Sequence, residues 1–229
     1  MIKLEIWPSF INKSLFELKN RDSKWELIVF KDSFEFLNDK GYIWKASNID
    51  SLIVEEIIKL SKEIIDNPPE NVLGIDGVSS KLLFEDKVIK FWSPKKNTKE
   101  LELVSLFFEL IDKNISEANC IDYMDLLSQY FFDIIPIKEF DEEIYRLKVF
   151  GGLTIRDLEI LSKKIENLKT KDLGILDMTN FLTTGSILNQ CFWEIKDKKN
   201  IKILVNKNAY NYLKAIGFED SQMEEIWQN

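Results

Sequence analysis

The sequence contains no histidine and only two cysteines, Cys120 and Cys191, among its 229 residues. Without imidazole the chain lacks the usual general base at neutral pH, so neither a Ser-His-Asp nor a Cys-His arrangement can form. Zinc sites need several Cys or His ligands, and two distant cysteines do not supply them. Two isolated cysteines in apolar surroundings instead indicate core residues in a reducing compartment.

Phosphate-binding loops and long hydrophobic runs are absent as well. The chain has neither a Gly-x-x-x-x-Gly-Lys-Ser/Thr loop nor a Gly-x-Gly-x-x-Gly fingerprint. No stretch approaches the ~18 uninterrupted apolar residues of a membrane span, and residues 1–6 lack the apolar core of an export signal. We therefore expect a cytoplasmic protein that uses no cofactor and no metal and does not associate with a membrane.

Acidic residues outnumber basic ones, with 39 Asp and Glu against 31 Lys and Arg, which gives a formal charge of -8. An acidic surface repels phosphate backbones, so we expect no nucleic-acid partner. Hydrophobic residues make up 45% of the chain, and 16 Phe and 6 Trp supply enough apolar volume for a sizeable core. The composition is that of a folded globular protein, and the absence of the usual catalytic groups leads us to expect one that acts by binding another protein.

The first half of the chain mixes strand and helix patterns, and we predict an α+β domain of no recognised family over residues 1–138. Its helices are expected to begin at Asn48 and at Thr98, both good N-cap residues. The first of them should end at Asn67-Pro68-Pro69 because proline cannot continue the hydrogen-bond ladder. The predicted strands cover residues 25–30, 42–44, 81–84 and 88–92, and a third helix covers residues 121–132.

The acidic, proline-containing segment 136–143 predicts a domain boundary, and residues 144–229 form the second predicted domain. Strands that alternate with single helices predict parallel pairing with right-handed crossovers. Residues Tyr145, Leu147 and Val149 alternate with Arg146 and Lys148, which predicts a strand with one wet face. The remaining expected elements are a helix capped by Thr154, a buried strand at 173–176, a loop at 177–184, a helix at 186–196, a strand at 201–205, and a helix at 209–216 capped by Asn206 or Asn208 and closed by Gly217.

This second half resembles the STAS domain, the family of the anti-sigma factor antagonists. The segments that carry the resemblance are residues 147–154, residues 174–179, residues 182–188, and the strand-helix-glycine run 202–218. The resemblance covers residues 144–229 and implies a βαβαβα fold that binds other proteins.

In that family a kinase partner phosphorylates a hydroxyl residue in an Asp-Ser-Ser/Thr-Gly motif, which switches binding. The matching run here is Leu182-Thr183-Thr184-Gly185, so the resemblance places the phosphorylated position at Thr184, with Leu182 where the family has aspartate. Hydroxyl groups at this place could also cap the following helix, which Thr183, Thr184 or Ser186 would do without phosphorylation.

Three functions are compatible with these patterns. The first is a non-enzymatic regulatory protein that binds a kinase or another regulator through the loop and helix at residues 180–196. The second is an immunity or antitoxin-like protein that neutralises a basic toxin, which the acidic charge balance favours. The third is a carboxylate-based hydrolase or transferase that uses Asp76 and Asp177, both near predicted turns. The candidate partner-binding residues are Asn180, Thr183, Thr184, Ser186, Asn189 and Gln190.

Overall fold

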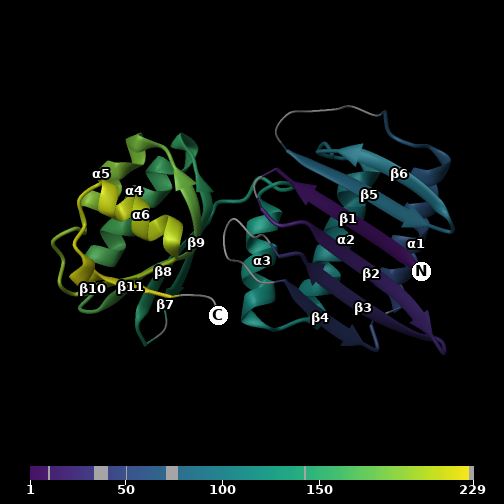
Figure 1. Ribbon diagram of the computed structural model, residues 1–229, viewed down its shortest axis with the longest axis horizontal. Helices are drawn as coiled ribbons and strands as arrows, with labels where there is room; N and C mark the ends of the chain where they lie inside the picture. The colour runs from purple at the N-terminus through teal and green to yellow at the C-terminus, as the bar shows by residue number, and fades with distance from the viewer. Residues whose placement is uncertain (10, 34–40, 50, 71–76, 142, 227–229) are drawn as a thin grey trace. The chain divides into compact units, whose positions relative to one another are not determined.

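The computed structural model of the chain describes residues 1–9, 11–33, 41–49, 51–70, 77–141 and 143–226. The chain folds into two compact units, Met1–Phe132 and Asp133–Asn229. Each unit contains one β-sheet and its own helices, which confirms the predicted α/β fold class (Figure 1). None of the described helices is both long and apolar enough to cross a membrane.

The first unit is built on a six-stranded antiparallel sheet with the strand order β4-β3-β2-β1-β5-β6. Its β5–β6 hairpin turns at Glu85 and Asp86, whose φ angles of 48° and 62° are the positive values that a tight two-residue turn requires. The strands are β1 (Ile2–Pro8), β2 (Ser14–Arg21), β3 (Lys24–Lys31), β4 (Tyr42–Ser47), β5 (Val78–Phe84) and β6 (Lys87–Trp92).

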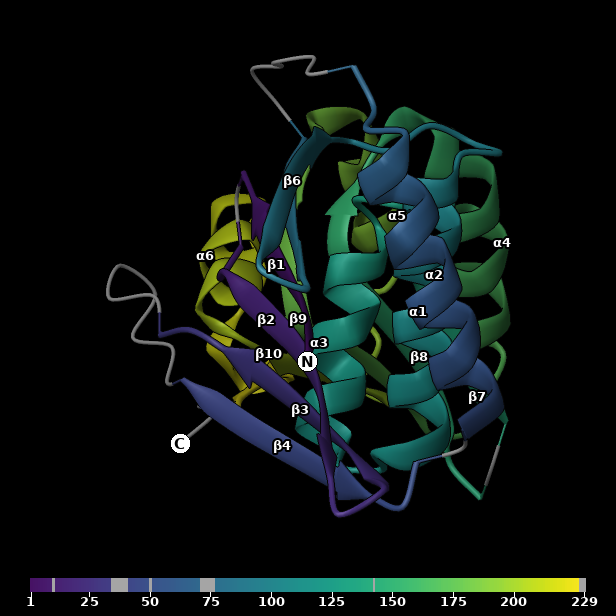
Figure 2. The same ribbon diagram turned by 90° about the vertical axis from the view of Figure 1, so that its right-hand side faces the viewer.

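Three helices cover one face of this sheet: α1 (Ser51–Asp66), α2 (Lys99–Asn114) and α3 (Ala118–Ser128). Figure 2 shows them together on one side of the strands. From β2, the Phe16 ring lies 6.0 Å from Phe107 of α2. From β4, Trp44 stacks on Tyr123 of α3 at 6.3 Å and donates a hydrogen bond from Nε1 to Asn119 Oδ1 at 3.0 Å. The core of the unit therefore lies on the face that carries Phe16 and Trp44.

Most of the predicted elements of the first unit are confirmed, including all four predicted strands and the end of α1 ahead of Pro68. Thr98 caps α2 as expected, because it accepts a hydrogen bond from the Leu101 N–H at 3.4 Å. Asn48 was wrongly expected to open α1. Its backbone is left-handed, with a φ of 61°, and it lies ahead of the first helical residue, Ser51. Strands β1 and β2 were not predicted from the sequence.

The second unit is built on a five-stranded sheet with the order β11-β10-β9-β8-β7. Parallel pairing joins β8 through β11, as predicted, and β7 alone is antiparallel to its neighbour. β7 occupies the acidic segment in which the sequence suggested a domain boundary. The strands are β7 (Ile137–Asp141), β8 (Tyr145–Leu153), β9 (Gly174–Thr184), β10 (Ile201–Val205) and β11 (Met223–Glu225).

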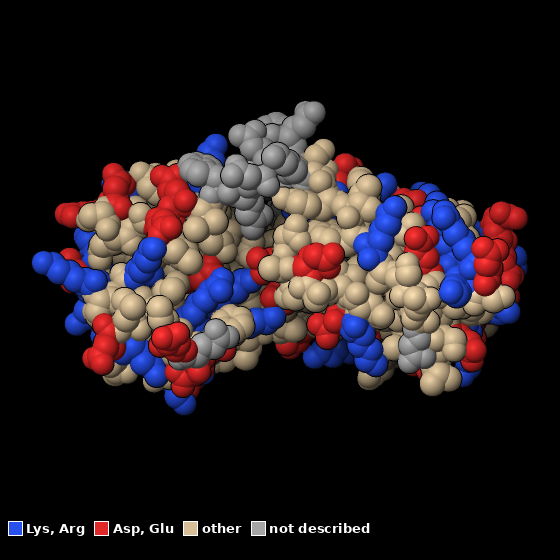
Figure 3. Space-filling model, turned by 90° about the horizontal axis from the view of Figure 1, so that it is seen from below, with Lys and Arg blue, Asp and Glu red and all other residues tan. Residues whose placement is uncertain are grey.

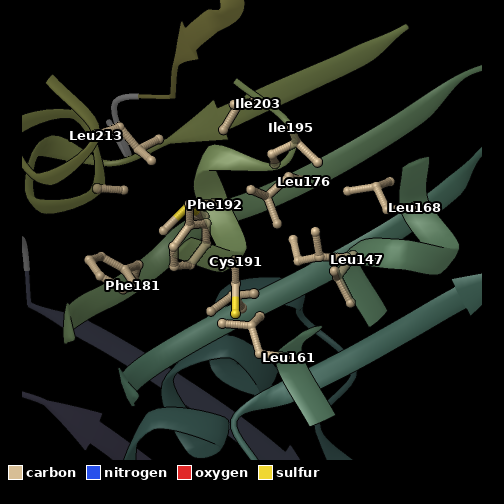
Figure 4. Close-up of a cluster of buried hydrophobic side chains, with 14 of the residues drawn as sticks. Leu147, Leu161, Leu168, Leu176, Phe181, Cys191, Phe192, Ile195, Ile203 and Leu213 are labelled. Atoms are coloured by element: carbon tan, nitrogen blue, oxygen red, sulfur yellow. The ribbon is translucent and has the colours of Figure 1, made fainter. Parts of the chain in front are cut away.

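The helices of this unit are α4 (Leu158–Lys169), α5 (Asn189–Trp193) and α6 (Lys207–Ala215). Their apolar residues pack with those of β8, β9 and β10 into one buried cluster, shown in Figure 4. The Phe181 ring from β9 lies 5.3 Å from Tyr212 of α6, and Phe192 of α5 meets the same tyrosine at 5.7 Å. All three helices therefore contribute to one core with the central strands of the sheet.

Three expectations for the second unit are wrong. Residues 177–184 are not a loop, because β9 continues to Thr184, and the helix expected at 186–196 is a 3-10 turn followed by the short α5. The supposedly wet face of β8 is also partly covered, since Lys148 is 5% exposed. By contrast, β10 has the predicted bounds, Asn206 caps α6 by accepting from the Ala209 N–H at 2.8 Å, and Gly217 has a left-handed φ of 94°.

The second core can be tested with two leucines that flank the start of β9. Leu176 is fully buried in the cluster, whereas Leu173 is 52% exposed. We expect Leu176→Ala to lower the free energy of unfolding by about 2–5 kcal/mol, because it removes buried apolar contacts and leaves a cavity. The matched variant Leu173→Ala should cost less than about 0.5 kcal/mol. Urea denaturation followed by tryptophan fluorescence measures both values, and equal losses would contradict the packing described.

Candidate functional site

Two short 3-10 turns leave neighbouring strands at the same edge of the second sheet. Leu153 at the end of β8 lies opposite Thr184 at the end of β9. Because the strands are parallel, their carboxyl ends meet at one edge, where ligand-binding loops of α/β sheets commonly lie. The turns are η2 (Ile155–Asp157) and η3 (Ser186–Leu188). We refer to residues 154–157 and 183–189 together as the two-turn edge.

The η2 turn is fixed by a reciprocal capping box. The Thr154 hydroxyl accepts a hydrogen bond from the Arg156 N–H at 3.3 Å and donates one to Asp157 Oδ2 at 3.0 Å. The Thr154 N–H also donates to Asp157 Oδ2, at 2.7 Å. These bonds satisfy amide groups that a helix start leaves without partners, as the sequence predicted for Thr154.

The η3 turn begins without any side-chain cap. Its N-cap residue is Gly185, whose carbonyl accepts a hydrogen bond from the Leu188 N–H at 3.1 Å. The Thr184 hydroxyl makes only a long contact of 3.4 Å to the Gly185 carbonyl. The expectation that Thr183, Thr184 or Ser186 would cap this helix is therefore wrong. Because β9 runs on to Thr184, the hydroxyl residues lie in or directly after the strand rather than in a capping loop.

Hydrogen bonds from α6 and its N-cap hold the two-turn edge from its buried side. The Tyr212 hydroxyl donates to Asn189 Oδ1 at 2.7 Å, and Asn206 Nδ2 donates to the Phe181 carbonyl at 2.8 Å. Tyrosine is protonated at neutral pH in any case, and burial raises the pKa of Tyr212 further above its ordinary value. These bonds tie the start of α5 and the end of β9 to the start of α6.

The outer side of the two-turn edge carries two exposed isoleucines, Ile155 at 62% and Ile187 at 48%. The same edge carries the exposed Thr183 and the exposed Gly185. A Cβ atom placed on Gly185 would have no other heavy atom within 4 Å, so the space beside it is open. Neither isoleucine was predicted as a surface residue from the sequence, since an apolar residue next to a helix start normally belongs to the core.

The predicted partner-binding residues differ in their accessibility. Ser186 and Gln190 are exposed with Thr183, whereas Thr184 and Asn189 are half-buried. Asn180 was expected to be exposed, but it is 6% exposed and pairs in register with Phe150 within the sheet. The correction follows from the length of β9, which places Asn180 inside the strand.

Asp177, one of the two proposed catalytic carboxylates, is fully buried and completely engaged. Its Oδ2 accepts from Arg146 Nε at 2.9 Å and from Arg146 Nη2, and its Oδ1 accepts from the Thr179 N–H at 3.0 Å and the Thr179 hydroxyl at 2.7 Å. These contacts bind the carboxylate between two strands and leave no oxygen directed toward solvent. Its proposed companion, Asp76, lies outside the described residues.

A polar cavity of about 360 Å3 lies at the opposite edge, between the end of β7 and the last turn of α4. Its charged groups pair with one another. Glu139 accepts hydrogen bonds from Tyr145 and Lys164, and Lys171 Nζ lies 3.3 Å from Asp141 and 4.7 Å above the Tyr145 ring. Burial acts to raise the pKa of Glu139, but the bonds from Lys164 and Tyr145 outweigh it and lower that pKa. The cavity therefore contains mutually neutralised groups rather than a poised acid or base.

Among the described ranges, no group of three or more Cys, Asp or Glu side chains is arranged to hold a metal ion. Both cysteines are buried, and burial raises the pKa of the Cys191 thiol above its ordinary value, which disfavours a reactive thiolate. No protein-family model matches the sequence, and no curated protein aligns with it significantly. The two-turn edge is thus defined by its geometry alone.

The role of Asp177 can be tested by the substitution Asp177→Asn. The variant removes a buried charge from Arg146, whose side chain is 44% exposed, and we expect the free energy of unfolding to fall by about 1–3 kcal/mol. The exposed Asp172 serves as the control, because Asp172→Asn makes the same chemical change without buried contacts. Thermal and urea denaturation measure both, and an unchanged stability in Asp177→Asn would contradict a structural role.

Proposed function

We propose that the chain is a non-enzymatic regulatory protein that binds another protein through the two-turn edge. The observation that carries this proposal is the pair of exposed isoleucines on neighbouring turns, with open space beside Gly185 on the same edge. Single exposed apolar residues are common on protein surfaces. Two that project from one rigidly supported edge resemble the apolar anchors of protein interfaces.

The rigid support of this edge favours recognition. The capping box at Thr154 and the hydrogen bonds from Tyr212 and Asn206 fix both turns before a partner arrives. A preorganised surface loses less conformational entropy when it binds, so more of the contact energy becomes affinity. The buried Asn180 contributes to the sheet, and the binding surface consists of the exposed residues around Thr183, Ile155 and Ile187.

The resemblance to STAS domains adds a partner-switching version of this proposal. The order of strands and helices in the second unit is the order on which that resemblance rests. In this version a kinase phosphorylates Thr184, which lies on the two-turn edge with Ile187. A phosphate there would bring nearly two negative charges next to the apolar anchors and would weaken their contact with an apolar partner surface.

The binding surface can be tested by Ile155→Asp and Ile187→Asp in the tagged full-length chain. Proteins recovered with the wild-type chain from its own cells would be quantified by mass spectrometry and then purified for affinity measurement. We expect each variant to weaken binding of the true partner at least fivefold, on the order of 1 kcal/mol or more, because an apolar anchor becomes a charge.

Ile144→Asp provides the matched control, since Ile144 is 40% exposed but lies just before β8, at the opposite edge. This variant should retain the partner. A partner that binds the Ile155 and Ile187 variants as tightly as the wild type would show that the interface lies elsewhere. Circular dichroism of each variant ensures that lost binding does not reflect lost folding.

The switching version makes a separate prediction for Thr184. We expect phosphopeptide analysis of the chain purified from its cells to find phosphate on Thr184. We also expect Thr184→Glu to weaken binding of the same partner whose binding Ile187→Asp weakens. The isosteric Thr184→Val should retain binding and abolish the phosphopeptide. Full binding by Thr184→Glu would reject the switch, while leaving the isoleucine result as an independent test of the interface.

Neutralisation of a basic toxin is the second candidate, and the formal charge of -8 favours it. A blocking surface of this kind would be a concentrated acidic patch. On the face shown in Figure 3, basic and acidic side chains are interspersed instead. Neutralisation would be favoured over the first proposal if the affinity for the partner falls steeply with rising salt and is unchanged by the two isoleucine substitutions.

A further inference from the structure

The first unit exposes a sheet face that none of its described helices covers. Helices α1–α3 pack against the side that carries Phe16 and Trp44, and side chains alternate between faces along each strand. The residues between those core positions therefore point the other way. The strand register arranges them in two rows that cross all six strands, and we call these two rows the open face.

The first row joins ion-paired and aliphatic residues. At its centre Glu17 is 5% exposed, and its carboxylate lies 3.1 Å from Lys3 Nζ and 2.8 Å from Lys19 Nζ. Burial acts to raise the pKa of Glu17, but hydrogen bonds from Lys19 and Lys3 outweigh it and lower that pKa. In order from β4 to β6, the row contains Lys45, Ile28, Glu17, Lys3, Leu83 and Val88.

The second row repeats this composition. Glu5 lies between two lysines, 3.5 Å from Lys13 Nζ and 3.4 Å from Lys81 Nζ. At the β4 end Ile43 is 61% exposed, and in the first row Val88 at the β6 end is 49% exposed. In order from β4 to β6, the row contains Ile43, Phe30, Leu15, Glu5, Lys81 and Lys90.

This composition is unusual for a sheet face that only meets water. Along a strand with one solvated face, the residues that point outward are normally polar. Each strand except β1 places at least one large apolar residue in the two rows, and β1 contributes Trp7 in the row beyond them, opposite Ser79. Lysines also outnumber glutamates in the rows, although the whole chain has a formal charge of -8. The open face is therefore both apolar and locally basic.

We propose that the open face docks a partner protein through a segment that presents carboxylates beside apolar side chains. Carboxylates of the partner complement the exposed Lys45 and Lys90, and its apolar residues cover Ile43 and Val88. This surface belongs to the first unit and is independent of the two-turn edge.

Charge complementarity favours this occupant over three others. A second copy of the chain would bring lysine-rich rows against each other. A nucleic acid or an anionic membrane would set its phosphates against Glu5 and Glu17 in the middle of the face.

The test uses the full-length chain and a fluorescein-labelled synthetic helical peptide composed of Glu, Leu and Ala with one apolar face. Anisotropy titration should show saturable binding in the micromolar range that weakens as salt is added. A peptide of the same composition in scrambled order, which has no apolar face, should bind at least roughly tenfold more weakly. The expected difference reflects the need for carboxylates and apolar groups together.

The double variant Lys45→Glu, Lys90→Glu should lower the affinity for the amphipathic peptide roughly tenfold or more, since both lysines are exposed on the open face. The control is Lys87→Glu, in the same strand as Lys90. Lys87 is exposed, but it pairs in register with the core residue Phe84 and therefore points away from the open face. It should leave affinity within twofold. A second variant, Ile43→Ser, removes an apolar contact without changing charge and should also weaken binding.

Several results would overturn the proposal: absence of saturable binding, equal binding of the scrambled peptide, or equal effects of the Lys87 and Lys45/Lys90 substitutions. Oligothymidine or phosphatidylserine vesicles serve as the competing probes, and either one binding through the same lysines in place of the peptide would identify a different occupant. Ile187→Asp in the second unit should not alter peptide binding, so this test and that of the two-turn edge succeed or fail separately.

Discussion

The parallel pairing of β8 with β9 determines where the candidate site of the second unit lies. Because Leu153 stands opposite Thr184, the turns that follow these strands leave the sheet at one edge and bring Ile155 and Ile187 to the same surface. The pairing is secured across the strands by the buried Asp177, which accepts hydrogen bonds from Arg146 of β8 and from its own neighbour Thr179. The ion pair between the buried Asp177 and the half-exposed Arg146 therefore supports the same strand pairing that positions the exposed edge.

Local patterns in the sequence were sufficient where an element satisfies its own backbone or has a clear apolar rhythm. β10 has the predicted bounds, and the caps at Thr98, Thr154 and Asn206 are those expected from their side chains. β9 was misread for a physical reason. The polar residues Asp177, Thr179 and Asn180 suggest a loop, yet the strand can contain Asp177 because Arg146, distant in sequence, provides the compensating charge.

Long-range pairing explains the other omissions, except that of β1. β1 alternates strictly from Ile2 to Ile6, so local periodicity was enough to predict it. β2 mixes charged and apolar residues at positions that look irregular until the register shows Lys3 beside Glu17. No single segment contains that information, because each ion pair joins two strands. The same holds for the candidate site, where the hydroxyl run at Thr183 and Thr184 was visible in the sequence but Ile155 became its neighbour only through the fold.

The two surfaces differ in how their apolar residues are presented, and this difference bears on the kind of partner each one suits. At the two-turn edge, isolated isoleucines project from turns that capping and side-chain hydrogen bonds fix in place, an arrangement that suits insertion into pockets of a partner. On the open face, apolar residues alternate with paired lysines and glutamates across six strands. Such a broad surface gains little from any one contact, and its charges contribute mainly to orientation and to exclusion of wrong partners. Under the two proposals, specificity would come from two physically distinct surfaces, one formed by turns at the carboxyl ends of parallel strands and the other by the sheet face opposite the helices of the first unit.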